Sequence, residues 1–208
     1  MRKIIILAII VFNVILITTS VQSGLAKGNI ALRFQEKETV TFFSAALLLL
    51  TSFSSFLTAH ILTLAGRVKK YANFWFLSGF GFFYLAMDEY FMAHEGIDKA
   101  VAKIFVPNIE RLEVDGVTIG VFGLIALCVC FKFRQQIMEQ KEILRFFFYA
   151  SIGFIWHIVF DLLYTRDAFI LIVLEESSKI IAVSLFFGGF LTVLLTNIKR
   201  YFANPSNN

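Results

Sequence analysis

The stretch Tyr84-Leu-Ala-Met-Asp88-Glu89-Tyr-Phe-Met-Ala-His94-Glu95 ends an apolar, aromatic run that begins near Phe74. A run of about 20 apolar residues is long enough to cross the roughly 30 Å hydrocarbon core of a bilayer. An ionised side chain inside a bilayer costs on the order of 3 kcal/mol on insertion scales, so unpaired charges are rare there. Asp88 and Glu89 are therefore expected to find partners on other helices, whereas His94 and Glu95, nearer the outer end, could either join them or reach the headgroups.

The composition of the whole chain is that of a membrane protein. Of its 208 residues, 58% are hydrophobic and 16% are charged, whereas soluble domains are close to half apolar and about a quarter charged. Long apolar runs separated by short basic loops predict an all-α, polytopic membrane helical bundle in one domain, residues 1–208. The net charge of +4 does not indicate a nucleic-acid partner, because Lys and Arg lie at segment ends, where membrane topology explains them.

We expect about six transmembrane helices, or five if the N-terminal segment is cleaved. The basic start Met1-Arg2-Lys3 and the apolar run after it fit either a signal peptide or a retained first helix, and we favour retention. Residues 134–142 read as a charged loop. The expected spans are residues 4–21, 40–64, 74–95, 117–133, 144–164 and 169–198.

The distribution of basic residues predicts the orientation. Lys and Arg are more frequent at the segment ends that share a side with the N-terminus than at the opposite ends. Because cytoplasmic loops carry the excess of Lys and Arg, both termini are expected in the cytoplasm. The expected location is the cell membrane of a bacterium or archaeon.

Three of the expected spans carry ionisable residues at a similar depth. Asp88 lies about 21 Å along the span that starts near Phe74, and His157 about 20 Å along the span that starts near Leu144, at 1.5 Å per residue. Glu175 lies about 9 Å below the outer surface in the inward-running last span, near 21 Å on the same scale for a 30 Å core. The spans are therefore predicted to share one polar site in the outer half of the bilayer.

Helical spacing predicts how these residues face. Tyr84, Asp88 and Glu95 share one face by i,i+4 and i,i+7 spacing. Glu175 and Lys179 stand at i,i+4 with the acid first, an arrangement in which the two charges can neutralise each other. The shared face predicts that Tyr84 lies beside the polar site.

The predicted site has a large excess of negative charge. A cluster this acidic in a low-dielectric medium must take up protons or cations. One or two divalent metal ions would meet that need, and mixed carboxylate and imidazole ligation suits Zn, Mn or Fe. In this interpretation the metal ligands are Asp88, His157, Asp161 and Glu175, the general base is Glu89 or Glu95, and the other site residues are His94, Glu176, Lys179 and Tyr84.

The pattern Asp-Glu-x4-His-Glu, here Asp88-Glu89 and His94-Glu95, is followed by Glu175-Glu176 in a later helix. This combination resembles a set of bacterial multipass membrane proteins of uncharacterised function. The resemblance implies a multipass helical fold and no activity.

Two classes of function follow from the polar site. The first is an intramembrane metal-dependent hydrolase that acts on a membrane lipid or another amphipathic small molecule, with a general base that activates a metal-bound water. The alternative is a proton- or cation-coupled transporter or sensor whose carboxylates relay protons, or a structural protein with a buried ionic network. A channel fits less well, because the inner halves of the helices are rich in Phe, Leu and Ile. No oligomeric state is indicated by the sequence.

Overall fold

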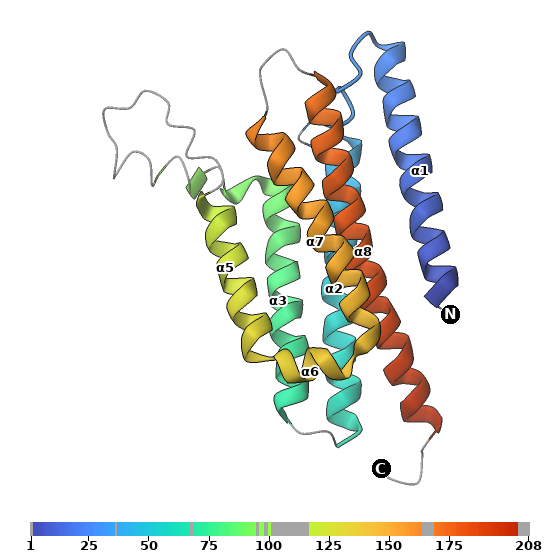
Figure 1. Ribbon diagram of the computed structural model, residues 1–208, viewed down its shortest axis with the longest axis vertical. Coiled ribbons are helices and arrows are strands. Elements are labelled where there is room, and N and C mark those ends of the chain that lie inside the picture. The colour runs from blue at the N-terminus through green and yellow to red at the C-terminus, as the bar shows by residue number, and fades with distance from the viewer. Residues whose placement is uncertain are drawn as a thin grey trace.

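The computed structural model describes residues 2–35, 37–66, 69–94, 96–97, 100, 117–163 and 169–203. The elements formed by these residues are α-helices that run mostly side by side in a bundle (Figure 1). The all-α helical bundle expected from the sequence is confirmed. The helices are α1 (Arg2–Ala26), α2 (Thr39–Leu64), α3 (Lys69–Phe91), α5 (Val117–Lys132), α6 (Arg134–Glu139), α7 (Lys141–Leu162) and α8 (Phe169–Ala203).

Helices α2 and α3 pack as an antiparallel pair through small and hydroxyl residues. Ser52 Oγ donates a hydrogen bond of 2.8 Å to the carbonyl of Gly79, and Ser55 Oγ donates one of 2.7 Å to the carbonyl of Trp75. A Cβ atom at Gly79 would lie 2.6 Å from the ring of Phe56, so the glycine is what lets this ring approach α3. Close contacts of this kind hold helices together where lipid supplies no hydrophobic driving force.

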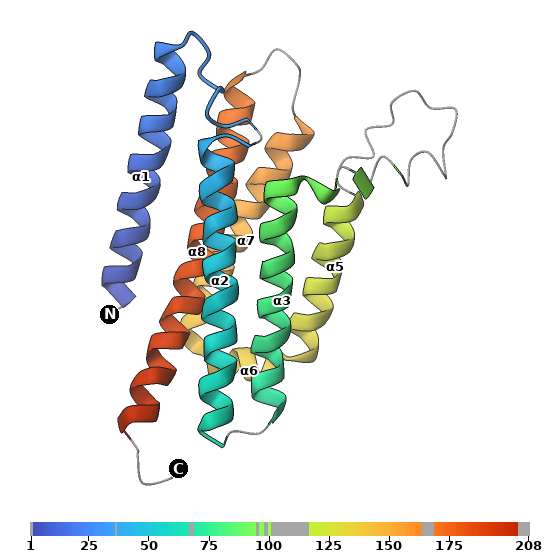
Figure 2. The same ribbon diagram turned by 180° about the vertical axis from the view of Figure 1, so that it is seen from behind.

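Helix α8 is the centre of the bundle and packs against α7, α2 and α1. Its contact with α7 uses Gly153, where an added Cβ would lie 2.9 Å from Cβ of Ala182. Helix α1 lies at the outer edge beside α8 (Figures 1 and 2). There Ser184 Oγ of α8 lies 3.3 Å from Oδ1 of Asn13 of α1.

Aromatic rings fill one half of the bundle interior. Phe190 of α8 is 1% exposed, and its ring centroid lies 5.4 Å from Trp75, 5.0 Å from Phe82 and 5.8 Å from Phe147. Phe186 adds ring contacts with Phe82 and Phe147. These five residues, referred to below as the aromatic cluster, join α3, α7 and α8.

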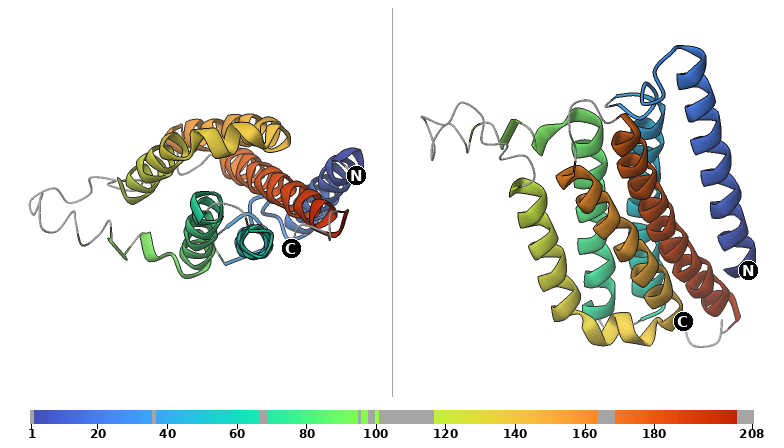
Figure 3. Two further views of the ribbon diagram at one scale, coloured as in Figure 1. Left: turned by 90° about the horizontal axis from the view of Figure 1, so that it is seen from below. Right: turned by 45° about the horizontal axis from the view of Figure 1, so that its top comes forward.

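Helices α5 and α6 form a side arm of the bundle. Helix α6 crosses the lower end between α5 and α7 (Figures 1 and 3). The expectation of a charged loop over residues 134–142 is wrong at this point, because Gln136 and Ile137 of α6 are buried against the bundle. Burial of these two residues stabilises a short helix, although the charged residues around them suggested a loop.

Among the described residues, four helical segments are long and apolar enough to cross a membrane: Arg2–Ala26, Thr39–Leu64, Ile143–Asp161 and Phe169–Ala203. Large apolar side chains such as Phe80, Leu127 and Phe148 are exposed on the outside of the bundle, as expected of a surface in contact with lipid. The membrane assignment rests on these features. Helix α3, the expected span of residues 74–95, is not among these segments, and the apolar part of α5, Gly120–Lys132, is shorter than a typical span, so the count of six spans stays a prediction.

Candidate functional site

Ionisable side chains from three helices gather at the end of the bundle where α3 and α7 finish and α8 begins (Figure 1). Their side chains are between 11% and 17% exposed. The shared depth predicted from the sequence therefore corresponds to a real meeting of α3, α7 and α8. The ionic cluster, as it is called below, consists of Glu89, His157, Glu175, Glu176 and Lys179.

Lys179 joins two helices within the ionic cluster. Its Nζ lies 2.7 Å from Oε1 of Glu176, one turn earlier on α8, and 2.9 Å from Oε1 of Glu89 on α3. The i,i+3 spacing on α8 places Lys179 and Glu176 on one face, and α3 brings Glu89 to that face. With all three groups ionised, the triad carries a net charge of −1.

His157 of α7 faces Glu175 of α8 at a longer distance. The Nδ1 atom of His157 lies 3.6 Å from Oε1 of Glu175, too far for a direct hydrogen bond. This ring nitrogen is buried and has no hydrogen-bond partner among the residues that the structure describes. The contact therefore becomes strongly attractive only when the imidazole carries a second proton.

Asp88, in the last turn of α3, forms a separate pair with His94, which lies beyond the end of that helix. Met92 adopts a left-handed conformation, with φ of 56°, and its N–H donates to the carbonyl of Asp88 at 2.7 Å. The turn brings the N–H of His94 to 2.7 Å from Oδ1 of Asp88 and the His94 ring Nδ1 to 2.9 Å from Oδ2. Both carboxylate oxygens of Asp88 are thus engaged by one residue.

The remaining predicted site residues lie elsewhere. Tyr84 packs its ring against Phe122 of α5, with centroids 4.6 Å apart, so it helps to hold α5 on α3. Asp161 is exposed near the end of α7. Glu95, one of the two expected general bases, lies outside the described residues.

The four predicted metal ligands do not form a common centre in the described part of the chain. No group of three or more His, Cys, Asp or Glu side chains there has the geometry to hold a metal ion. The cause is visible in the pairing: Asp88 is turned to His94, and Glu175 faces His157. The metal site and the hydrolase stay predictions that the described residues do not support.

Sequence reasoning missed the contact that joins α3 to α8. The i,i+4 rule paired Lys179 with Glu175, whereas the ammonium contacts Glu176 of its own helix and Glu89 across the interface. Depth alone did not indicate the pair, because on the same scale Glu89 lies about 22 Å and Lys179 about 15 Å along their spans. The long side chain of Lys179 spans this difference once the two helices are packed together.

Comparison with known protein families gives a match that covers most of the chain. A family model described as a domain of unknown function (DUF8692) matches residues 4–194. No curated protein and no solved structure matches the chain.

Proposed function

The chain belongs to the DUF8692 family, and we propose from its ionic cluster that it is a proton-responsive membrane protein, either a proton-coupled transporter or a proton sensor. In this proposal the proton binds at His157, and the new charge there changes the contact between α8 and α3. It takes up the second of the two function classes that the sequence left open. The experiment below also tests the first class, the metal-dependent hydrolase.

The observation that carries the proposal is the buried Nδ1 of His157, which lies 3.6 Å from the Glu175 carboxylate and makes no hydrogen bond to any residue that the structure describes. Histidine is the side chain whose charge changes most readily between pH 5 and 8. A proton on this nitrogen converts a weak contact into an ion pair. At a separation near 4 Å and an effective dielectric constant near 20, the attraction between two unit charges is about 4 kcal/mol.

The neighbouring charges supply a route from this proton to another helix. Glu175 and Glu176 are adjacent on α8, and Glu176 shares Lys179 with Glu89 of α3. A second cation at His157 competes with Lys179 for the carboxylates of α8. Binding of a proton on α7 is therefore coupled to the strength of the contact between α3 and α8, as two sites that bias one equilibrium must be.

The test uses a tryptophan that lies next to the site. Trp156 is exposed on α7 and its ring stacks on Phe160 at 5.5 Å, and the chain contains one other tryptophan, Trp75. In a Trp75→Phe background, the fluorescence of Trp156 in liposomes is followed as the pH falls from about 8 to about 3, a range that covers ordinary histidine titration and extends below it because burial disfavours the charged imidazole. We expect a sigmoidal change that disappears when His157→Gln is added.

The control is His60→Gln, since His60 is exposed on α2 and lies outside the ionic cluster. This variant should keep the transition. An unchanged transition in His157→Gln would overturn the proposal.

A dye that reports internal pH, enclosed in the same liposomes, distinguishes a transporter from a sensor. A stoichiometric metal in the purified protein, with activity lost on chelation, would favour the hydrolase instead.

A further inference from the structure

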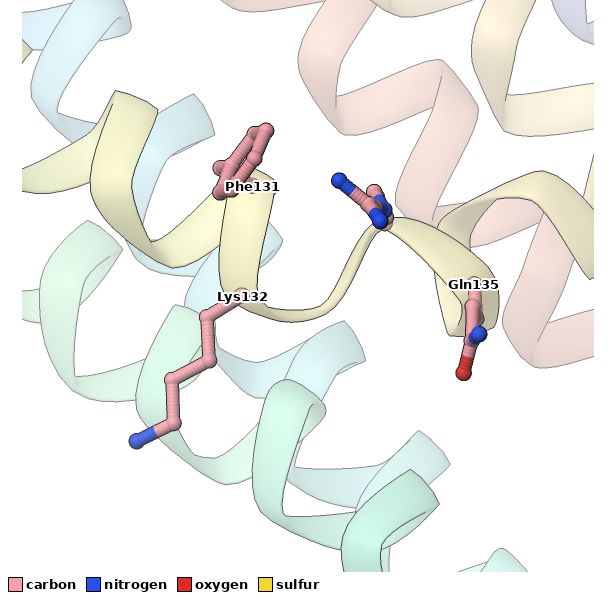
Figure 4. A pocket seen from close by; sticks show the side chains of 4 residues that line it. Phe131, Lys132 and Gln135 are labelled. Atoms are coloured by element: carbon pink, nitrogen blue, oxygen red, sulfur yellow. The ribbon is translucent and has the colours of Figure 1, made fainter.

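The corner between α5 and α6 lies at the end of the bundle opposite the ionic cluster (Figure 1). An open cavity of about 290 Å³ lies at this corner. Figure 4 shows Phe131, Lys132 and Gln135 around the turn that joins the two helices. The fourth lining residue is Arg134. Two cations and an aromatic ring thus line one open cavity, with the side chains of Phe131 and Lys132 extending from the turn in different directions (Figure 4).

Aromatic rings position both cations at the corner. The guanidinium carbon of Arg134 lies 4.8 Å from the ring centroid of Phe131, and Nζ of Lys132 lies 5.7 Å from that of Phe133. Cation–π contacts at such distances attract a cation to the ring without neutralising its charge. Lys132 and Arg134 are exposed, so their charge is available to an anion outside the protein.

An apolar stripe on α5 leads to the same corner. Leu124, Leu127 and Phe131 stand at i, i+3 and i+7, which places them on one helix face, and they are 64%, 67% and 71% exposed. Met138 of α6 is also exposed beside the corner. The surface therefore combines a face that suits a hydrocarbon chain with a cationic end that suits a phosphate.

We propose that this corner binds an anionic phospholipid, with the phosphate between Lys132 and Arg134 and one acyl chain along Leu124, Leu127 and Phe131. Basic residues at the end of an apolar helix attract anionic headgroups at a membrane surface. A soluble phosphate would use the two cations alone and would leave the apolar stripe without a role. The stripe is the reason to assign a lipid.

The experiment compares two double variants in lipid nanodiscs made with phosphatidylcholine, with or without phosphatidylglycerol. Lys132→Gln with Arg134→Gln removes the cations of the corner. Lys199→Gln with Arg200→Gln removes the same charge from exposed residues near the end of α8, at the same end of the bundle (Figure 1). Retention of phosphatidylglycerol is measured by native mass spectrometry, and apparent affinity by titration of a labelled phosphatidylglycerol.

We expect the corner variant to weaken phosphatidylglycerol binding by roughly thirtyfold, the combined contribution of two basic residues at an anionic surface, while the α8 variant changes it little. Leu127→Ser should also weaken binding of the lipid, with the cations intact. Equal losses in both double variants would show a general surface-charge effect and overturn the proposal. Binding of glycerol 3-phosphate as tight as that of the lipid would overturn the assignment to a lipid.

Discussion

The aromatic cluster and the ionic cluster are built from the same three helices and hold them by different forces. In the aromatic cluster the ring of Phe190 contacts Trp75, Phe82 and Phe147, and dispersion between such rings does not depend on protons. In the ionic cluster Lys179 and His157 hold carboxylates whose charge a proton can remove. The contacts of the aromatic cluster are therefore independent of pH, whereas those of the ionic cluster depend on which of its groups carry a proton.

The largest effect is expected from Lys179→Met, which leaves the carboxylates of Glu89 and Glu176 close together without their cation. Removing one partner of a buried ion pair costs about 3–5 kcal/mol of unfolding free energy. The loss should shrink in acid, because protonated carboxyl groups no longer repel each other. Equilibrium unfolding in mixed detergent micelles at neutral and acidic pH measures both quantities.

The matched rescue is the triple variant that adds Glu89→Gln and Glu176→Gln to Lys179→Met. It removes all three charges and should recover most of the lost stability, since an uncharged set has no unpaired ion. Equal instability of the single and triple variants would show that Lys179 acts through its shape. In that case both clusters would be held by packing, and the proposed difference between them would be wrong.

The next effect in size is expected from Phe190→Ala in the aromatic cluster. Truncation of a buried aromatic ring costs about 3 kcal/mol or more through the cavity that it leaves. This loss should be the same at neutral and acidic pH, because no charge is involved. Unfolding under the conditions used for Lys179→Met provides the comparison, and a strong pH dependence for Phe190→Ala would break it.

The smallest effect is expected from Gly153→Ala, at a position on α7 between the two clusters. The new Cβ would lie 2.9 Å from Cβ of Ala182 and 3.2 Å from the carbonyl oxygen of Ser178, so α7 must move away from α8. Overpacking of this kind costs roughly 1–3 kcal/mol. Because His157 lies one turn further along α7, the variant should also shift the pH midpoint of the Trp156 fluorescence.

A loss of stability with an unchanged midpoint would show that the spacing of α7 and α8 at Gly153 does not affect the His157–Glu175 contact. The control is Gly123→Ala on α5, where an added Cβ meets nothing within 4 Å. That variant should leave the midpoint unchanged and should raise stability slightly, by up to about 1 kcal/mol, because alanine favours a helix more than glycine does. Far-ultraviolet circular dichroism confirms that both variants keep their helices.

The sequence was sufficient to predict the helical bundle and the shared depth of its polar residues. Depth along a helix depends only on residue number and on a rise of 1.5 Å per residue. This rule could not predict the partner of Asp88. Its partner His94 reaches it through a left-handed turn at Met92, a conformation that a residue other than glycine rarely adopts.

Boundaries and partners were harder to predict than depth. Helix α1 runs over Arg2–Ala26, beyond the expected span of 4–21, and α8 reaches Ala203 instead of residue 198. The choice of Glu89 as partner of Lys179 depends on how α3 and α8 are rotated about their axes. That rotation is set by packing at residues such as Phe190, so charge patterns alone could not determine it.

The contact between Glu89 and Lys179 also constrains how the chain is made. Lys179 follows Glu89 by 90 residues in the sequence, and ribosomes add about 5–20 residues per second. Glu89 therefore waits roughly 5–20 s for its cation after it has been synthesised. During this interval α2 and α3 can already pair through Ser52 and Ser55. If α3 crosses the membrane, as the sequence predicts, the carboxyl group of Glu89 enters the membrane protonated or remains at its surface until α8 arrives.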